Sequence, residues 1–271
     1  MKKVYLLLLK NRCVMNKKRK LNKKKLLLFF FMIVFLIMLI LSAIKIISYI
    51  IYNKENKKIQ EAIIEDSITV IEPIEENQKI KYNIDFKSLK EQNPDTVAYL
   101  KVNNTNIDYI IVKGNDNGYY LKHNFEKKWN VSGWIFADYH NKFDESDKNI
   151  IIFGHNTRDG SMFGTLKNTL NENWYNNEEN HKIVLVTEYG TYFYQVFSTY
   201  SIKPEDYYIN TEFDNYDEFD KFIKKLKSRS VYDYGIEVSG EDKVLTLSSC
   251  IGDGTKRVVL HAKLIEIEED L

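Results

Sequence analysis

The stretch that decides the fold is "DKVLTLSSCIGDGTKRVVLHAKLIEI", residues 242–267. Two runs rich in aliphatic residues, 242–250 and 256–267, flank a short turn that contains two glycines, and this pattern predicts a β-hairpin. Cys250 ends the first predicted strand and Arg257 opens the second. We therefore expect these two residues to face each other across the mouth of the hairpin.

Upstream of the hairpin, further runs predict strands that are separated by polar turns rather than by the helices a parallel sheet requires. This pattern predicts a mainly β fold, either a mostly antiparallel barrel or a sandwich. Two segments, 162–177 and 214–232, predict short helices, the second from apolar residues at helical spacing, and a third short helix is expected between a cap at Asp85 and an end at Asn93-Pro94. The remaining strands are expected at 96–102, 106–114, 132–139, 149–155, 181–188 and 190–202.

The N-terminal segment predicts a membrane anchor. Lysine and arginine crowd residues 10–25, and "LLLFFFMIVFLIMLILSAI" (26–44) follows without a charge. This apolar run is long enough to cross a hydrocarbon core of ~30 Å as a helix. A cleaved signal peptide is the alternative, but its apolar region is usually about 7–15 residues long and ends at a small-residue cleavage site. Here bulky residues follow Ser42-Ala43, which favours an uncleaved anchor.

The expected organisation follows from this anchor. Residues 1–25 form a basic cytoplasmic N-terminus, 26–52 the single transmembrane span, 53–80 a stalk or N-terminal helix, and 81–271 the folded domain. Because positive charge stays inside, the folded domain is expected outside the cell membrane. Either Met1 or Met15 is the true start, since Met15 also begins a normal sequence for such an anchor.

The cysteine count narrows the chemistry of the exported domain. The chain has two cysteines, of which Cys13 precedes the anchor and Cys250 alone follows it. A single exported cysteine is a reactive thiol, an intermolecular bridge or a small buried apolar residue. A thiol attacks only as thiolate and needs positive charge nearby. Arg257 cannot act as a base, because it stays protonated, but it stabilises a thiolate and a developing oxyanion.

A proton carrier must come from the five histidines. His155 ends the predicted strand "NIIIFGH" and opens a loop, which places it at the rim of a pocket and makes it the best candidate. His261 lies in the middle of a predicted strand, too far from Arg257 to share its site. We expect surface positions for the others, His123, His140 and His181.

The sequence motifs of other common enzyme classes are absent. The sequence contains no CxxC, HExxH or GxSxG and no complete phosphate-binding loop. One exported thiol and dispersed histidines do not make a zinc site, so we expect no metal and no other cofactor. With 39 Lys+Arg against 38 Asp+Glu, the net charge of +1 gives no reason to expect a nucleic-acid partner.

These residues together resemble the sortases, the membrane-anchored cysteine transpeptidases of Gram-positive bacteria. "TLSSC" (246–250), Arg257 shortly after it and "FGHN" (153–156) upstream are similar to the family pattern, with Ser249 where threonine is usual. The stretches 93–125 and 159–164 resemble class B sortases in particular. The resemblance implies an eight-stranded β-barrel with added helices.

The resemblance also implies roles. Cys250 would attack the threonine carbonyl of a C-terminal sorting signal of NPxTx type or a close variant, and a thioacyl enzyme would result. His155 would be the general acid and base, and Arg257 would hold the oxyanion and the substrate backbone. The implied partners are exported proteins that bear the signal and an amine of a cell-wall peptide or its lipid-linked precursor. The thioester conserves the acyl bond energy, so no nucleotide is needed.

Neighbouring residues leave alternatives open. Ser248 and Ser249 precede Cys250, and both are candidates for binding substrate. The alternative for Ser248 is that its side chain only points into the barrel. Asp138 and Asp159 either orient His155 or belong to solvated turns. An exported cysteine hydrolase of the same fold, a pilin-polymerising sortase and a non-catalytic wall-binding module are the rival functions.

Overall fold

The computed structural model describes residues 22–71, 80–250 and 255–268. The chain divides into two compact units, Met1–Ser48 and Tyr49–Leu271. Helix α2 (Lys23–Ser67) is long and apolar enough to cross a membrane by its length and composition. The helix continues without a break through the predicted end of the span at residue 52, so the predicted stalk begins as part of the same helix.

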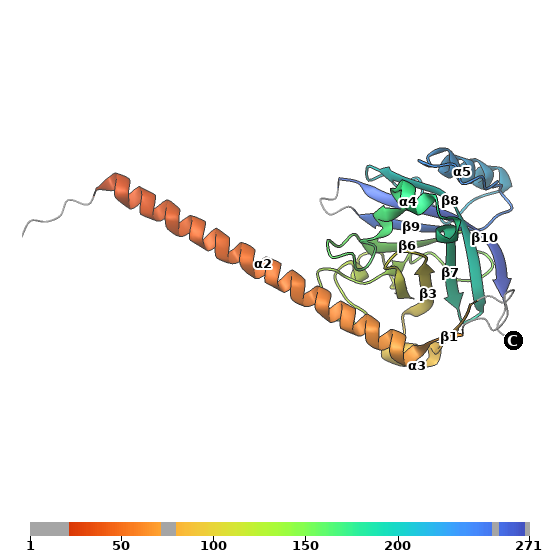
Figure 1. The fold of residues 1–271 in the computed structure, drawn as a ribbon, viewed down its shortest axis with the longest axis horizontal. Coiled ribbons are helices and arrows are strands. Elements are labelled where there is room, and N and C mark those ends of the chain that lie inside the picture. Colours follow the sequence, from red (N-terminus) through yellow and green to blue (C-terminus); the bar gives the residue numbers. More distant parts are fainter. Residues whose placement is uncertain (1–21, 72–79, 251–254, 269–271) are drawn as a thin grey trace, which may run out of the picture. The chain divides into compact units, whose positions relative to one another are not determined.

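The second unit contains a closed barrel of eight strands within the residues that the structure describes (Figure 1). The strand order around the barrel is β10-β8-β7-β3-β4-β5-β6-β9. The predicted mainly β fold is confirmed, and of the two predicted architectures the barrel is the one formed. The strands are β3 (Thr96–Val102), β4 (Asp108–Val112), β5 (Phe136–Ala137), β6 (Asn149–His155), β7 (Lys182–Thr187), β8 (Gly190–Ile202), β9 (Val244–Cys250) and β10 (Arg257–Glu268).

Most neighbouring strands are antiparallel, as predicted, but β4 pairs with β5 and β6 pairs with β9 in parallel. The strand predicted over 132–139 is wrong in extent, because only Phe136–Ala137 pair as a strand. Gly133 has a φ of +55°, in the left-handed region, where the extended conformation cannot continue. A further two-stranded sheet, β1 (Ile68–Ile71) with β2 (Lys81–Ile84), was not predicted.

The helices of the second unit are short. Helix α3 (Phe86–Gln92) precedes β3, and α5 (Tyr216–Ser228) forms within the predicted segment 214–232. The single helix predicted over 162–177 is wrong. It divides into the 3-10 turn η2 (Leu166–Leu170) and α4 (Glu172–Tyr175), because Asn171 between them is extended, with φ −94° and ψ 139°. Two more 3-10 turns are η1 (Tyr119–Leu121) and η3 (Glu178–His181).

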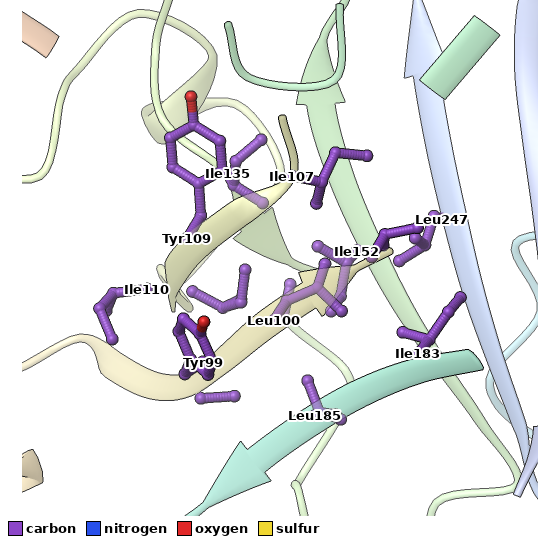
Figure 2. Close-up of a cluster of buried hydrophobic side chains, with 14 of the residues drawn as sticks. Tyr99, Leu100, Ile107, Tyr109, Ile110, Ile135, Ile152, Ile183, Leu185 and Leu247 are labelled. Carbon is purple, nitrogen blue, oxygen red and sulfur yellow. The ribbon is translucent and has the colours of Figure 1, made fainter. Parts of the chain in front are cut away.

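Alternation along the strands divides the buried apolar residues into two clusters. Leu247 of β9 faces the barrel interior, where it joins the cluster around Tyr99 and Leu100 (Figure 2). Leu245 belongs to the same cluster. Val244 belongs instead to a second cluster that α5 covers from outside, with Phe219 and Ile223 among others. Strand β9 is therefore buried on both faces, which makes it a rigid platform for the residue at its end.

Candidate active site

The end of β9 brings the three predicted catalytic residues into one row. Cys250 pairs in register with His155 on one side, through the parallel β6–β9 ladder. On the other side it pairs with Arg257, through the antiparallel β9–β10 hairpin. Neighbouring strands lie about 4.8 Å apart, so the row spans roughly 10 Å from His155 to Arg257. Cysteine, histidine and arginine on three adjacent strands are residue types that can carry out acyl transfer together.

The register that makes this row is regular. Seven consecutive residues of β6, Asn149 to His155, pair one by one with Val244 to Cys250. The hairpin pairs Val244 with Lys263 and continues without a bulge to Cys250 with Arg257. Because no residue is inserted on either side, the position of Cys250 is set by two complete ladders rather than by the loop that follows it.

The backbone before His155 requires glycine. A Cβ on Gly154 would lie 2.5 Å from Cδ1 of Ile135 and 2.7 Å from Cγ of Phe163, and both of these side chains are fully buried. After His155 the chain turns back on itself, since the amides of Thr157 and Phe163 both donate to the His155 carbonyl, at 3.1 and 3.0 Å. The histidine thus lies between a tightly packed strand and a closed loop.

The imidazole of His155 is held by a backbone carbonyl. Its Nε2 lies 2.8 Å from the oxygen of Leu121. A carbonyl oxygen only accepts, so Nε2 carries the proton in this contact. In the neutral ring Nδ1 is then the acceptor, which is the state a general base requires.

Arg257 is held by the segment that follows β8. Its Nη1 donates to Tyr208 Oη at 3.1 Å and to the Glu205 carbonyl at 3.5 Å, and it lies 3.7 Å from a carboxylate oxygen of Asp206. Tyr208 Oη in turn lies 2.9 Å from Ser248 Oγ. Sequence reasoning missed Tyr208, because nothing in "PEDYYIN" marks one tyrosine as a partner of the hairpin.

The two serines before Cys250 differ in their surroundings. Ser248 is buried and bonds Tyr208, so it supports the arginine rather than pointing into the barrel interior. Ser249 shares the interior face with Leu247, is fully buried, and its Oγ has no hydrogen-bond partner in the described structure. A direct contact of Ser249 with substrate would require its surroundings to move, whereas Ser248 lies one hydrogen bond from the Arg257–Tyr208 pair.

The other four histidines lie outside the row of His155, Cys250 and Arg257. His261 is fully buried, with Nδ1 2.9 Å from Thr246 Oγ1 and Nε2 2.9 Å from Tyr200 Oη, and burial lowers its pKa to about 3. The expected surface position of His181 is wrong: burial lowers its pKa, and its ring packs among Trp174, Tyr175 and Tyr234. His140 is exposed and His123 stacks on Tyr119 at the surface.

Neither of the two aspartates considered for orienting His155 bonds it in the described structure. Asp138 accepts from Asn117 at 2.8 Å and lies 2.8 Å from Nδ1 of His140. Asp159 accepts from Asn53 at 2.7 Å and from Ser161. Among the described residues no group of histidine, cysteine and acidic side chains is arranged to hold a metal ion.

A closed eight-stranded barrel with cysteine, histidine and arginine in one row is the arrangement expected of a sortase. Residues 100–265 match the family model of the sortase domain. The chain belongs to the sortase family of cysteine transpeptidases.

Within the family, several similar proteins are sortases B. Sortase B of Staphylococcus aureus (strain NCTC 8325 / PS 47) is 35% identical over 186 residues, which cover 67% of this chain and 75% of that protein. The structure of a Staphylococcus aureus sortase B–substrate complex is 34% identical, with a TM-score of 0.64 over 68% of this chain and 85% of that one. A sortase B complexed with triglycine is 34% identical, with a TM-score of 0.64 over 68% and 86% of the two chains.

Proposed function

We propose that this chain is a class B-type sortase that cleaves a C-terminal sorting signal of NPxTx type, or a close variant, after threonine. It then transfers the new carboxyl group to an amine of a cell-wall peptide or its lipid-linked precursor. The observation that carries the proposal is the single row formed by His155, Cys250 and Arg257 on three adjacent strands. The attached surface protein would thereby become covalently bound to the wall.

The acyl-transfer steps assign one role to each residue of the row. The Cys250 thiolate attacks the threonine carbonyl, and the carbonyl oxygen takes the negative charge beside the Arg257 guanidinium. The C–N bond then breaks, His155 gives the leaving amine the proton that its Nδ1 took from the Cys250 thiol, and a thioester remains. In the second half, the acceptor amine attacks the thioester and passes a proton to His155, and the thiolate leaves.

The substrate classes are supported by the two complexes of related sortases. One sortase B structure contains substrate, and another contains triglycine, a peptide with a free amino group. We infer that this chain likewise takes a peptide signal as donor and a peptide amine as acceptor. A lysine side chain of a pilin subunit would use the same chemistry and differ only in the amine.

We infer a single-pass location in the cell membrane. The apolar first part of α2 would cross the bilayer, with the basic residues before it in the cytoplasm and the barrel outside. This topology leaves Cys250 as the one cysteine outside the cell, where exported substrates and wall precursors meet it.

The test is peptide turnover by the full chain in detergent. With an NPxTx-type peptide and triglycine, we expect a threonyl–triglycine product, no turnover by Cys250→Ala, and slower hydrolysis when the amine is omitted. If water alone resolves the thioester even at high triglycine, the chain is a hydrolase of the same fold. If Cys250→Ala behaves as the wild type, the chain is a non-catalytic module.

A further inference from the structure

The part of α2 that belongs to the second unit carries a row of polar side chains that bond the barrel. Tyr49, Asn53, Asn56 and Gln60 recur at helical spacing, so they lie on one face of the helix. Tyr49 Oη accepts from the amide of Arg158 at 3.1 Å. The other three bond barrel residues through their side-chain amides, with Asp159, the Gly133 carbonyl and the Asp108 carbonyl as acceptors.

Both asparagines are bonded through Nδ2 and through Oδ1. Asn53 is 5% exposed; its Nδ2 donates to Asp159 Oδ2 at 2.7 Å, and its Oδ1 accepts from Ser132 Oγ. Asn56 is 1% exposed; its Nδ2 donates to the Gly133 carbonyl at 3.0 Å, and its Oδ1 accepts from Asn130 at 2.8 Å. Apolar residues would bury a helix face without this demand for partners, so the asparagines fix its position residue by residue.

One set of contacts reaches His155 through the loop that follows it. Arg158 and Asp159, which bond α2, are three and four residues beyond the histidine. The loop is closed by bonds between Ser161 and Asp159 and between Thr157 and Ser161, and it returns to the His155 carbonyl through the amide of Phe163. Burial raises the pKa of Asp159, but the bonds from Ser161, Thr157 and Asn53 outweigh it and keep the carboxyl ionised.

A second set of contacts reaches the imidazole of His155 from the other side. The Gly133 carbonyl that receives Asn56 belongs to a residue packed against the backbone of Tyr120 and Leu121. A Cβ on Gly133 would overlap the Tyr120 oxygen and would lie 2.9 Å from the Leu121 oxygen. The Leu121 oxygen is the atom that binds Nε2 of His155. Residues 53 and 56 of α2 thus brace both the loop after the histidine and the carbonyl that holds its ring.

We infer that residues 49–56 of α2 are a positioning element for His155, which they hold through the Asp159 loop and through the Gly133–Leu121 contact. The inference rests on the proposed function, in which His155 moves the protons. None of these helix residues bonds the histidine itself; they act by fixing what surrounds it.

An exchange of acid and amide across the contact tests this role in the full chain in detergent. Asn53→Asp keeps the size of the side chain and the oxygen that accepts from Ser132. It replaces the hydrogen bond to Asp159 by two carboxylates that face each other. We expect kcat for peptide transfer to fall about tenfold or more with KM within about twofold, since a small misplacement of a catalytic group slows chemistry. Asn53→Asp combined with Asp159→Asn exchanges donor and acceptor, and we expect kcat to return to within about threefold of the wild type.

A matched control lies on the same helix. Glu61→Gln also interconverts acid and amide, but Glu61 is exposed and pairs with Lys57 of the same helix, at 3.7 Å, so kcat should not change. Melting temperatures separate positioning from folding: a purely structural role predicts that Asn53→Asp lowers the melting temperature while the folded protein keeps its kcat. If Asn53→Asp does not fold, Tyr49→Phe tests the inference instead, because it removes the hydroxyl that accepts from the Arg158 amide in the loop. An unchanged kcat in that variant would overturn the inference.

A second measurement does not depend on the sorting peptide. In a Cys13→Ser background, the rate of Cys250 alkylation by iodoacetamide reports how readily the thiol gives up its proton. We expect Asn53→Asp to slow alkylation about fivefold or more and the exchanged pair to restore it, because His155 is the register partner of Cys250. If the wild type turns over no peptide while alkylation still follows this pattern, the proposed function fails and the positioning stands. Equal alkylation rates in all three proteins would overturn the positioning.

Discussion

His155 and Cys250 are direct register partners, although they lie in strands far apart in the sequence. The pairing is parallel, and it is the last pair of an unbroken seven-residue ladder between β6 and β9. The proposed general base and the proposed nucleophile are therefore placed by the same strand pairing that closes the barrel. The geometry of the proposed site is a property of the sheet, and we expect changes that disturb the ladder to disturb the chemistry.

Replacement of His155 by glutamine separates the hydrogen bond to the Leu121 carbonyl from proton transfer. Glutamine keeps an N–H donor for the Leu121 carbonyl, which now receives Nε2 at 2.8 Å, but it cannot accept and return a proton. We expect the rate of acylation to fall by about 10²–10⁴, with the melting temperature within a few degrees of the wild type. Stopped-flow measurement of amine release from a sorting peptide checks this. An unaltered acylation rate would mean that another group carries the proton.

Tyr208 is predicted to hold the guanidinium of Arg257 in place. Tyr208→Phe removes the hydroxyl that receives Arg257 Nη1 and bonds Ser248, while the ring stays in the apolar cluster under α5. Loss of one charge-assisted bond predicts a fall in kcat/KM of about 5- to 30-fold. Steady-state kinetics measure it, and Tyr207→Phe, whose hydroxyl bonds Tyr200 instead, is the control. Equal losses in both variants would point to general destabilisation of the segment.

The pairing of Cys250 with Arg257 was predictable from the sequence, but the pairing of Cys250 with His155 was not. A short turn between two strand-like runs is enough to place Cys250 opposite Arg257, because a hairpin pairs neighbours in the chain. The parallel pairing of β6 with β9 leaves no local mark, so the sequence indicated that His155 ends a strand without indicating which strand lies beside it. The strand end made His155 the best candidate for the proton carrier, and the family resemblance implied the same role, but neither gave its register.

Residues whose places depend on tertiary packing were missed for the same reason. Tyr208 reaches the site because the chain after β8 folds over the outer face of β9, which no periodicity in that segment predicts. His181 was expected at the surface from its polar neighbours, but the rings of Trp174, in the nearby α4, and of Tyr234, from a distant segment, cover it. The strand over 132–139 failed at Gly133, whose positive φ follows from its packing against Tyr120 rather than from its own neighbours.

Gly154 is predicted to be intolerant of any side chain. In Gly154→Ala the new methyl group would overlap Ile135 and Phe163 in the closed interior, so we expect a loss of about 1–3 kcal/mol in the free energy of unfolding. Urea unfolding of the full chain measures this. Adding Ile135→Val removes the Cδ1 atom that lies 2.5 Å away and should recover part of the loss. Gly114→Ala is the control, because its nearest contacts are at 3.5 Å, an ordinary van der Waals distance.

His261 predicts a specific loss of stability in acid. Burial lowers its pKa to about 3 in the folded chain, against about 6.5 when unfolded, so between these values only the unfolded chain binds a proton there. The free energy of unfolding therefore falls as the pH drops below about 6.5 and stops falling, for this group, near pH 3. At pH 4.5 the contribution is about 3 kcal/mol, at 1.36 kcal/mol for each pH unit.

Replacing His261 by glutamine removes this titration. Glutamine offers a donor and an acceptor to Thr246 and Tyr200, the two partners of the imidazole, but it does not protonate. Carboxylates also titrate in this range, so the quantity to measure is the difference between the two proteins in urea unfolding at pH 7 and pH 4.5. The wild type should lose about 3 kcal/mol more than His261→Gln between these two conditions. Equal losses would mean that the imidazole takes up its proton without leaving the folded barrel.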